Sequence, residues 1–125
     1  MGTKNVGGLV GNNYDVIDNS TSLGTVTGTV YRIGGLVGYN QDSAYINDSY
    51  SDTVVESEEK TGGLVGYNRN SYISSSYSSG TTRGIDEIGG LIGYNHNSDI
   101  DWCSNNGNVY GEGFTGGLIG FNFYG

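Results

Sequence analysis

A string of five residues, Gly-Gly-Leu-(Val/Ile)-Gly, recurs five times along this chain of 125 residues. Successive copies start 27 or 28 residues apart. They begin at Gly7, Gly34, Gly62, Gly89 and Gly116. Self-similarity at a fixed period of this length indicates stacked structural units. We therefore expect one domain over residues 1–125, with repeats at 7–33, 34–61, 62–88 and 89–115 and a partial repeat at 116–125.

Other positions recur in the same register, and stacking would turn each into a column of like side chains. The Leu of the string is invariant, at Leu9, Leu36, Leu64, Leu91 and Leu118. An Asn follows each string, at Asn13, Asn40, Asn68, Asn95 and Asn122. An Ile recurs at Ile17, Ile46, Ile73 and Ile100. We expect these three sets to be structural ladders, with the Asn in left-handed corners or bonded amide to amide along the stack.

The residue types favour strands over helices. Gly, Ser, Thr, Asn, Tyr and Val dominate, and all are poor helix formers. Val, Ile, Thr and Tyr suit strands, whereas Gly, Asn and Ser suit the corners between them. Each unit reads as three short strands, in the third unit at 63–67, 72–77 and 81–85, with corners near 68–71, 78–80 and 86–89. The predicted fold is all-β, a three-sided parallel β-solenoid of about 4.5 coils, with the right-handed crossovers that parallel strands prefer.

A solenoid also accounts for the low apolar content of 34%. A narrow coil needs few inward side chains, and we assign the Leu column to that role. Neighbouring residues of a strand face opposite sides, so the adjacent Val/Ile column would then point outwards. The opposite assignment, with Val/Ile inwards and Leu outwards, is also open. An aromatic column accompanies it, at Tyr39, Tyr67, Tyr94 and Phe121. This column is either an exposed interaction surface or a stack of rings that shields the backbone.

The string Gly-Gly-Leu-Val-Gly-Tyr-Asn, followed by Tyr-Ile, Ser-Tyr-Ser and a Gly, resembles the GLUG motif. The resemblance covers nearly the whole chain in five copies. GLUG repeats occur in bacterial immunoglobulin A peptidases and in large secreted adhesins, as accessory β-helical segments. The resemblance therefore implies an extracellular or surface-associated role, and it assigns no catalytic residue.

Composition and charge argue against several functions. The net charge of −8 would repel nucleic acid and anionic membrane surfaces. No stretch approaches the roughly 18 apolar residues of a membrane span, and residues 1–10 lack the features of a signal peptide. The acidic residues are unevenly placed, so we expect a solvated face rather than a catalytic pair. We therefore predict no enzyme activity and no cofactor.

Single residues of reactive or modifiable type have a structural explanation. His96 and Cys103 stand alone, and a zinc site needs several ligands at fixed spacing. Cys103 falls in a column with Ser20, Ser49 and Ser76, so we expect a cramped inward position. Two sequons, at Asn19 and Asn47, are candidate glycosylation sites on neighbouring coils.

The leading hypothesis is therefore an extracellular or cell-surface structural or adhesive module with cell-surface or glycan partners. A second hypothesis is a filament subunit that associates with itself end to end or laterally, because uncapped coils invite pairing. A third is a carbohydrate-binding or carbohydrate-processing β-helix. Nothing in the residues names a particular ligand.

Overall fold

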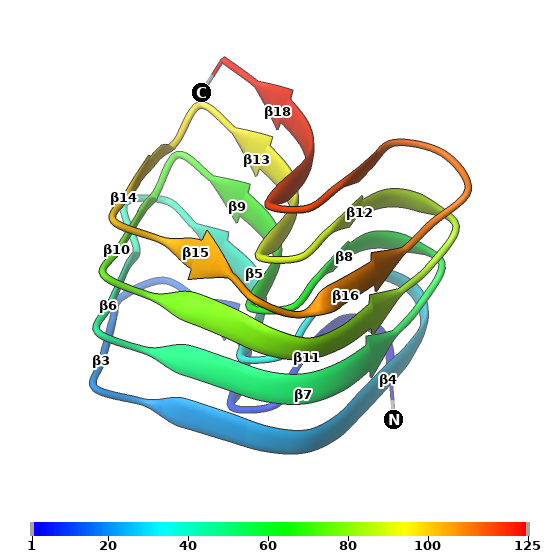
Figure 1. Cartoon of the computed structure of the whole chain (residues 1–125). Helices are drawn as coiled ribbons and strands as arrows, with labels where there is room; N and C mark the ends of the chain where they lie inside the picture. Colours follow the sequence, from blue (N-terminus) through cyan, green and yellow to red (C-terminus); the bar gives the residue numbers. More distant parts are fainter. Residues whose placement is uncertain (1, 125) are drawn as a thin grey trace.

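The computed structural model describes residues 2–124, which form eighteen β-strands and no helix. Each strand pairs in parallel with the equivalent strand of the neighbouring coil (Figure 1). The predicted all-β parallel β-solenoid is thus confirmed, with about four stacked turns. No helix among residues 2–124 is long and apolar enough to cross a membrane.

Each full coil contributes strand segments to four sides of the solenoid. The first side contains β1 (Gly2–Gly7), the second half of β4 (Thr21–Gly34), β8 (Glu59–Gly62), β12 (Asp86–Gly89) and β17 (Thr115–Gly116). The second contains β2 (Val10–Asn13), β5 (Val37–Gln41), β9 (Val65–Arg69), β13 (Ile92–His96) and β18 (Ile119–Phe123). The third contains β3 (Val16–Asp18), β6 (Tyr45–Asn47), β10 (Tyr72–Ser74) and β14 (Asp99–Asp101). The fourth contains the first half of β4, β7 (Tyr50–Glu56), β11 (Tyr77–Arg83), β15 (Ser104–Asn105) and β16 (Asn108–Tyr110).

The number of strands per coil differs from the three expected. Residues 86–89, expected to be a corner, form β12 and pair with β8. The corner expected at 78–80 lies inside β11, where Gly80 has a φ of 94° and the strand continues. The long β4 belongs to two sides, so the four sides form three hydrogen-bonded sheets.

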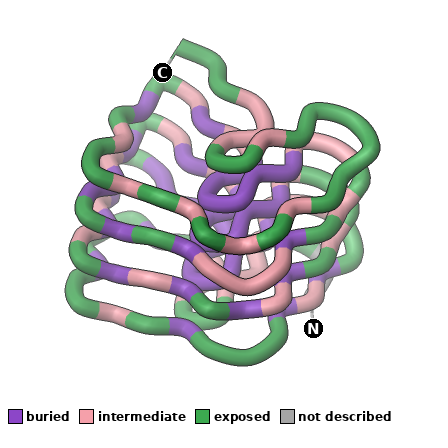
Figure 2. Tube along the Cα trace, in the orientation of Figure 1, coloured by how far each residue is buried: buried purple, intermediate pink, exposed green. Residues whose placement is uncertain are grey.

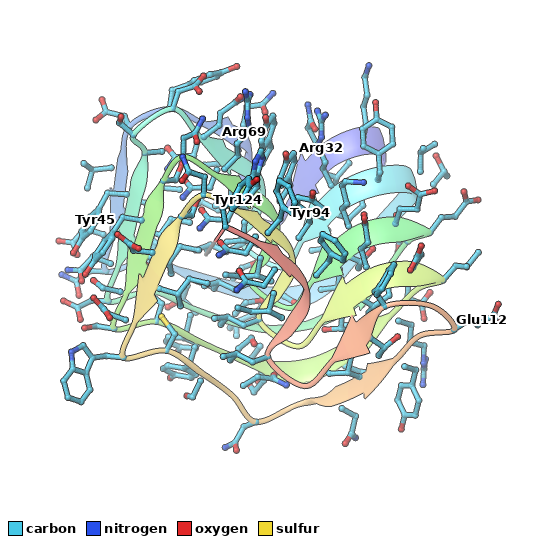
Figure 3. The ribbon with its side chains drawn as sticks, turned by 90° about the horizontal axis from the view of Figure 1, so that it is seen from above. Arg32, Tyr45, Arg69, Tyr94, Glu112 and Tyr124 are labelled. Atoms are coloured by element: carbon cyan, nitrogen blue, oxygen red, sulfur yellow. The ribbon has the colours of Figure 1, made fainter. Side chains whose placement is uncertain are left out.

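The extra strand exists because the chain bends inwards between the first and second sides (Figures 1 and 3). The last Gly of each string makes this inward bend possible. A Cβ on Gly66 would lie 2.4 Å from the backbone nitrogen of Ile33, and one on Gly93 would lie 2.4 Å from that of Thr61. Any side chain there would force the two sides apart. The invariant glycine therefore marks a close backbone-to-backbone contact between the first and second sides.

The inward bend divides the core into two clusters. The larger contains Leu36, Leu64 and Leu91 with the Ile ladder, and Ile46 and Ile73 are fully buried (buried segments are purple in Figure 2). Leu9 and Leu118, expected to face inwards, are 50% and 38% exposed, because no further coil covers them. The smaller lies between the fourth and first sides and contains Val26, Ile33 and Val55. Between the clusters, a Ser column of the fourth side lies against the second Gly of the first three strings, and a Cβ on Gly35 would lie 2.0 Å from Ser51 Oγ.

The expected outward stripe of Val and Ile is wrong. Val37, Val65 and Ile92 are fully buried in the same cluster as the Leu ladder. Strict alternation fails because the Leu lies at a bend just before the strand begins. The backbone nitrogens of Leu36 and Val37 both donate to the carbonyl oxygen of Leu64, at 2.9 and 3.0 Å. Consecutive side chains can therefore enter one interior.

Candidate functional site

The Asn column forms a buried ladder of amides along the solenoid. Each Nδ2 donates to the Oδ1 of the Asn one coil further on, at 2.8, 2.8, 3.0 and 2.8 Å from Asn13 to Asn122. Asn40 and Asn68 are fully buried. None of these residues has the left-handed backbone that was one expectation. That conformation occurs a few residues later, at Ser43, Asn70 and Asn97. The ladder satisfies polar groups and fixes the rung register, so its role is structural.

The column of Ser20, Ser49, Ser76 and Cys103 lies where the third side meets the fourth. Ser49 and Ser76 are buried, and their hydroxyls donate to the carbonyl oxygens of Asn47 and Ser74, at 2.8 and 2.7 Å. Cys103 is half-buried against the larger core cluster. Burial raises the pKa of its thiol, which disfavours the reactive thiolate.

The aromatic column lies at the inward bend rather than on an open face. Tyr39 is buried, and Tyr67, Tyr94 and Phe121 are half-buried. Tyr39 and Tyr67 stack with centroids 4.8 Å apart, whereas Tyr94 meets Tyr67 edge-on. Burial and the neighbouring Tyr39 raise the pKa of Tyr67. Tyr39–Tyr67 and Tyr94–Phe121 therefore stack, and an edge-on contact joins the two pairs, close to the interpretation of a ring stack.

Charged side chains from the first side cover these rings. The Arg32 guanidinium carbon lies 4.5 Å from the centroid of Tyr39, and Lys60 Nζ lies 5.3 Å from that of Tyr94. Lys60 also pairs with Glu87, with Nζ and Oε2 2.6 Å apart. Arg32 and Tyr94 can be followed in Figure 3 at the inward bend. These cations are engaged in cation–π contacts and ion pairs that hold the bend together.

The two sequons do not lie in one column. Asn19 is exposed at a left-handed corner, and its equivalent in the next coil is Asp48. Asn47 is half-buried, and its Nδ2 donates to Asp18 and Asp48, at 3.0 and 3.1 Å. A glycan on Asn47 would replace one of the two amide hydrogens that make these bonds, so Asn19 is the better presented of the two.

The lone His96 contacts aromatic rings rather than metal ligands. Its Nδ1 lies 3.3 Å from the Tyr67 hydroxyl, and its ring packs against Phe123. Within residues 2–124, no three His, Cys, Asp or Glu side chains lie close enough together to hold a metal ion.

A cavity of about 420 Å³ lies at the C-terminal end of the described coils. Ile100, Leu118, Ile119 and Asn95 contribute to its wall. These residues belong to the core and Asn ladders, so the cavity continues the solenoid interior and is not a separate ligand site.

The most organised outer surface is on the third side, and sequence analysis did not identify it. Tyr45 and Tyr72 stack there with centroids 4.9 Å apart, and Tyr45 is labelled on this face in Figure 3. Beside them runs a polar column of Asp18, Asn47, Ser74 and Asp101. The Tyr45 hydroxyl is 2.8 Å from Ser74 Oγ, which donates to Asn47 Oδ1 at 2.7 Å. The Tyr72 hydroxyl donates to Asp101 at 2.6 Å, and this hydrogen bond raises its pKa to about 12.

The neighbouring corner carries a residue that the repeat does not explain. Its four equivalent positions hold Asn19, Asp48, Ser75 and Trp102, each with a left-handed backbone. The Trp102 side chain is 91% exposed. The sequence signal was present, because Trp102 is one bulky aromatic in a column of small polar residues.

The GLUG motif matches residues 2–27 and 87–110, which lie in the first coil and near the C-terminal end of the described chain. No curated protein and no solved structure matches the chain significantly. The two matched stretches are separated by coils that repeat the same string, ladders and strand pairing. The chain accordingly carries the GLUG motif in two stretches and folds as a parallel β-solenoid.

Proposed function

We propose that this GLUG solenoid is a non-catalytic structural and adhesive module that works outside the cell, as a rigid spacer or binding rod of a surface protein. The observation that carries the proposal is the continuous ladder of buried Asn and Ile side chains from coil to coil. Each rung is fixed to the next, so the outer columns keep their spacing along the rod.

The outer surface supports a display role. Tyr45 and Tyr72 on the third side, and Tyr50 and Tyr77 on the fourth, form stacked pairs with centroids 4.9 and 4.8 Å apart. Ordered, solvent-facing aromatic and hydrogen-bonding groups suit recognition of a partner. A catalytic site would instead need one precise constellation of residues. One column of the fourth side instead changes its side-chain chemistry from coil to coil. It contains Thr27, Glu56, Arg83 and Tyr110.

An adhesion assay tests the proposal. Beads carrying the purified chain should adhere to cells or to extracellular polysaccharide, and beads carrying the denatured chain should not. The same preparation should release no sugar from a polysaccharide panel. Adhesion no greater than that of the denatured control, or release of reducing sugar, would overturn the proposal.

Light scattering after size-exclusion chromatography separates this function from the filament hypothesis. A uniform species of 13.2 kDa supports the module. Growing polymers seen by electron microscopy would favour the filament.

A further inference from the structure

Trp102 is the outer residue that least resembles its equivalents. It is the single Trp of the chain, it is 91% exposed, and its backbone φ is 54°. Left-handed backbone is tolerated by Asn and Asp and is a genuine outlier for a bulky residue. Asn19, Asp48 and Ser75 occupy the equivalent corners. Trp102 thus accepts backbone strain and leaves its apolar surface in water, and neither stabilises the fold.

Trp102 stands at one end of a surface that we name the corner strip: Asn19, Asp48, Ser75 and Trp102, with the adjoining column Asp18, Asn47, Ser74 and Asp101. The strip runs along the solenoid axis. Its polar groups are held in place, because Asn47 donates to Asp18 at 3.0 Å and accepts from Ser74 at 2.7 Å. Beside Trp102, the Tyr72 hydroxyl holds the Asp101 carboxylate at 2.6 Å.

Stacked Tyr pairs flank the strip on both sides. Tyr45–Tyr72 and Tyr50–Tyr77 have interplanar angles of 6° and 3°. In each pair, one face of each ring lies against the other ring. Trp102 is different, because an indole ring that is 91% exposed offers an open π face. The surface therefore combines one stacking platform with a row of hydrogen-bonding groups.

We propose that the corner strip binds a neutral polysaccharide along the solenoid axis, with one sugar ring stacked on Trp102. A pyranose presents a face of C–H groups, which suits the electron-rich face of an indole. Its hydroxyls can donate to Asp101 and Asp18 and exchange hydrogen bonds with Asn47, whereas the buried Ser74 positions Asn47 from behind. Equivalent groups repeat at about 4.8 Å along the strip, close to the length of one hexose in an extended chain.

Charge and shape separate this ligand from other classes. Asp18, Asp48 and Asp101 lie in the strip with no Lys or Arg, so phosphate or an acidic polysaccharide would be repelled. A protein partner would need an apolar interface core, whereas polar groups surround Trp102. The inference rests on the proposed adhesive function and names its ligand class.

The single Trp allows a direct test by intrinsic fluorescence. The chain is titrated with neutral oligosaccharides from cellulose, mannan, xylan and chitin, and with alginate as the anionic comparison. We expect at least one neutral series to shift the Trp emission with little dependence on salt. No response to any neutral series, or a response only to alginate, would overturn the inference.

Variants then separate binding from folding. Trp102→Ser installs the residue of the previous coil, so the unfolding midpoint should stay equal or rise. Affinity, measured by calorimetry, should fall by roughly tenfold or more, as for one lost stacking contact. Tyr110→Ser removes another exposed aromatic, on the fourth side, and should leave binding unchanged. Equal saccharide affinity of Trp102→Ser and the parent chain would contradict the inference.

The adhesion assay distinguishes the two failures. If the parent chain adheres and Trp102→Ser adheres equally well, the corner strip is not the site, although the adhesive function stands. If the chain adheres by binding a protein on the target surface, and no saccharide competes with that binding, the proposed ligand class is wrong. If the parent chain adheres to nothing, the proposed function itself fails.

Discussion

Asn40 Nδ2 donates a hydrogen bond of 2.8 Å to Asn68 Oδ1, and both side chains are fully buried although 28 residues separate them. The donor belongs to one coil and the acceptor to the next, so this contact depends on the rung register. A shift by one residue would leave both amides unpaired in the interior. The ladder therefore specifies the stacking as well as stabilising it.

Replacing the central Asn should be costly. Asn68→Ala leaves Asn40 Nδ2 and Asn95 Oδ1 buried without their ladder partners. We expect the free energy of unfolding to fall by about 2–4 kcal/mol, the cost of one or two unsatisfied buried groups. Urea denaturation measures this loss. Asn106→Ala changes an exposed Asn and should cost less than about 0.5 kcal/mol; equal losses in both variants would argue against a buried ladder.

The Ile ladder offers a matched pair of identical substitutions. Ile73 is fully buried, whereas Ile85 is 50% exposed. Ile73→Ala should lower the free energy of unfolding by about 2–5 kcal/mol, because a cavity replaces packed methylenes. Ile85→Ala should cost about 1 kcal/mol or less, because folding removes less of the Ile85 apolar surface from water. The account fails here if calorimetric melting ranks the two variants in the opposite order.

The inward bend predicts a sharp difference between two glycines. Gly66→Ala would place a Cβ 2.4 Å from the Ile33 nitrogen, so the first and second sides must separate. Gly117→Ala meets nothing within 4 Å. We expect Gly66→Ala to lower the melting temperature strongly or to prevent folding, and Gly117→Ala to be tolerated. Circular dichroism during heating checks both, and a well-folded, equally stable Gly66→Ala protein would show that the bend is absent.

The hydrogen bond from Tyr72 to Asp101 predicts a pH dependence. The folded-state pKa of Tyr72 is raised from 10.0 to about 12. The stabilisation it provides is therefore complete below pH 10 and is lost as the pH rises towards about 12. Tyrosinate absorbance, compared between the parent chain and Tyr72→Phe, isolates this titration. Asp101→Asn removes the carboxylate and should lower the midpoint; a midpoint near 10 in the parent chain would disprove the hydrogen bond.

Much of the fold could be predicted from the repeat. The offsets of 27 and 28 residues placed Leu36, Leu64 and Leu91 in equivalent positions, and all three are buried in one cluster. Fixed spacing is enough for such predictions, because parallel coils stack equivalent residues directly above one another. The Asn amides along the stack follow from the same spacing.

The inward bend could not be predicted, because a contact between backbones leaves only glycine as its signal. Glycine equally marks turns, so Gly38, Gly66 and Gly93 were ambiguous. Without the bend, the aromatic column containing Tyr39 was expected on an open face or in a simple stack. The burial of Val37 was missed for a related reason, since the alternation rule holds within a strand and fails at a corner.

Cysteine cross-linking tests the stacked-coil arrangement most directly. In a Cys103→Ser background, Tyr50→Cys with Tyr77→Cys places two thiols in register on adjacent rungs, about 4.8 Å apart at Cα. Tyr50→Cys with Ser104→Cys places them two rungs apart, about 10 Å, beyond the reach of a disulfide. The account predicts rapid intramolecular oxidation of the first pair and none of the second. Cross-linking of the second pair as readily as the first, or failure of the first, would contradict it.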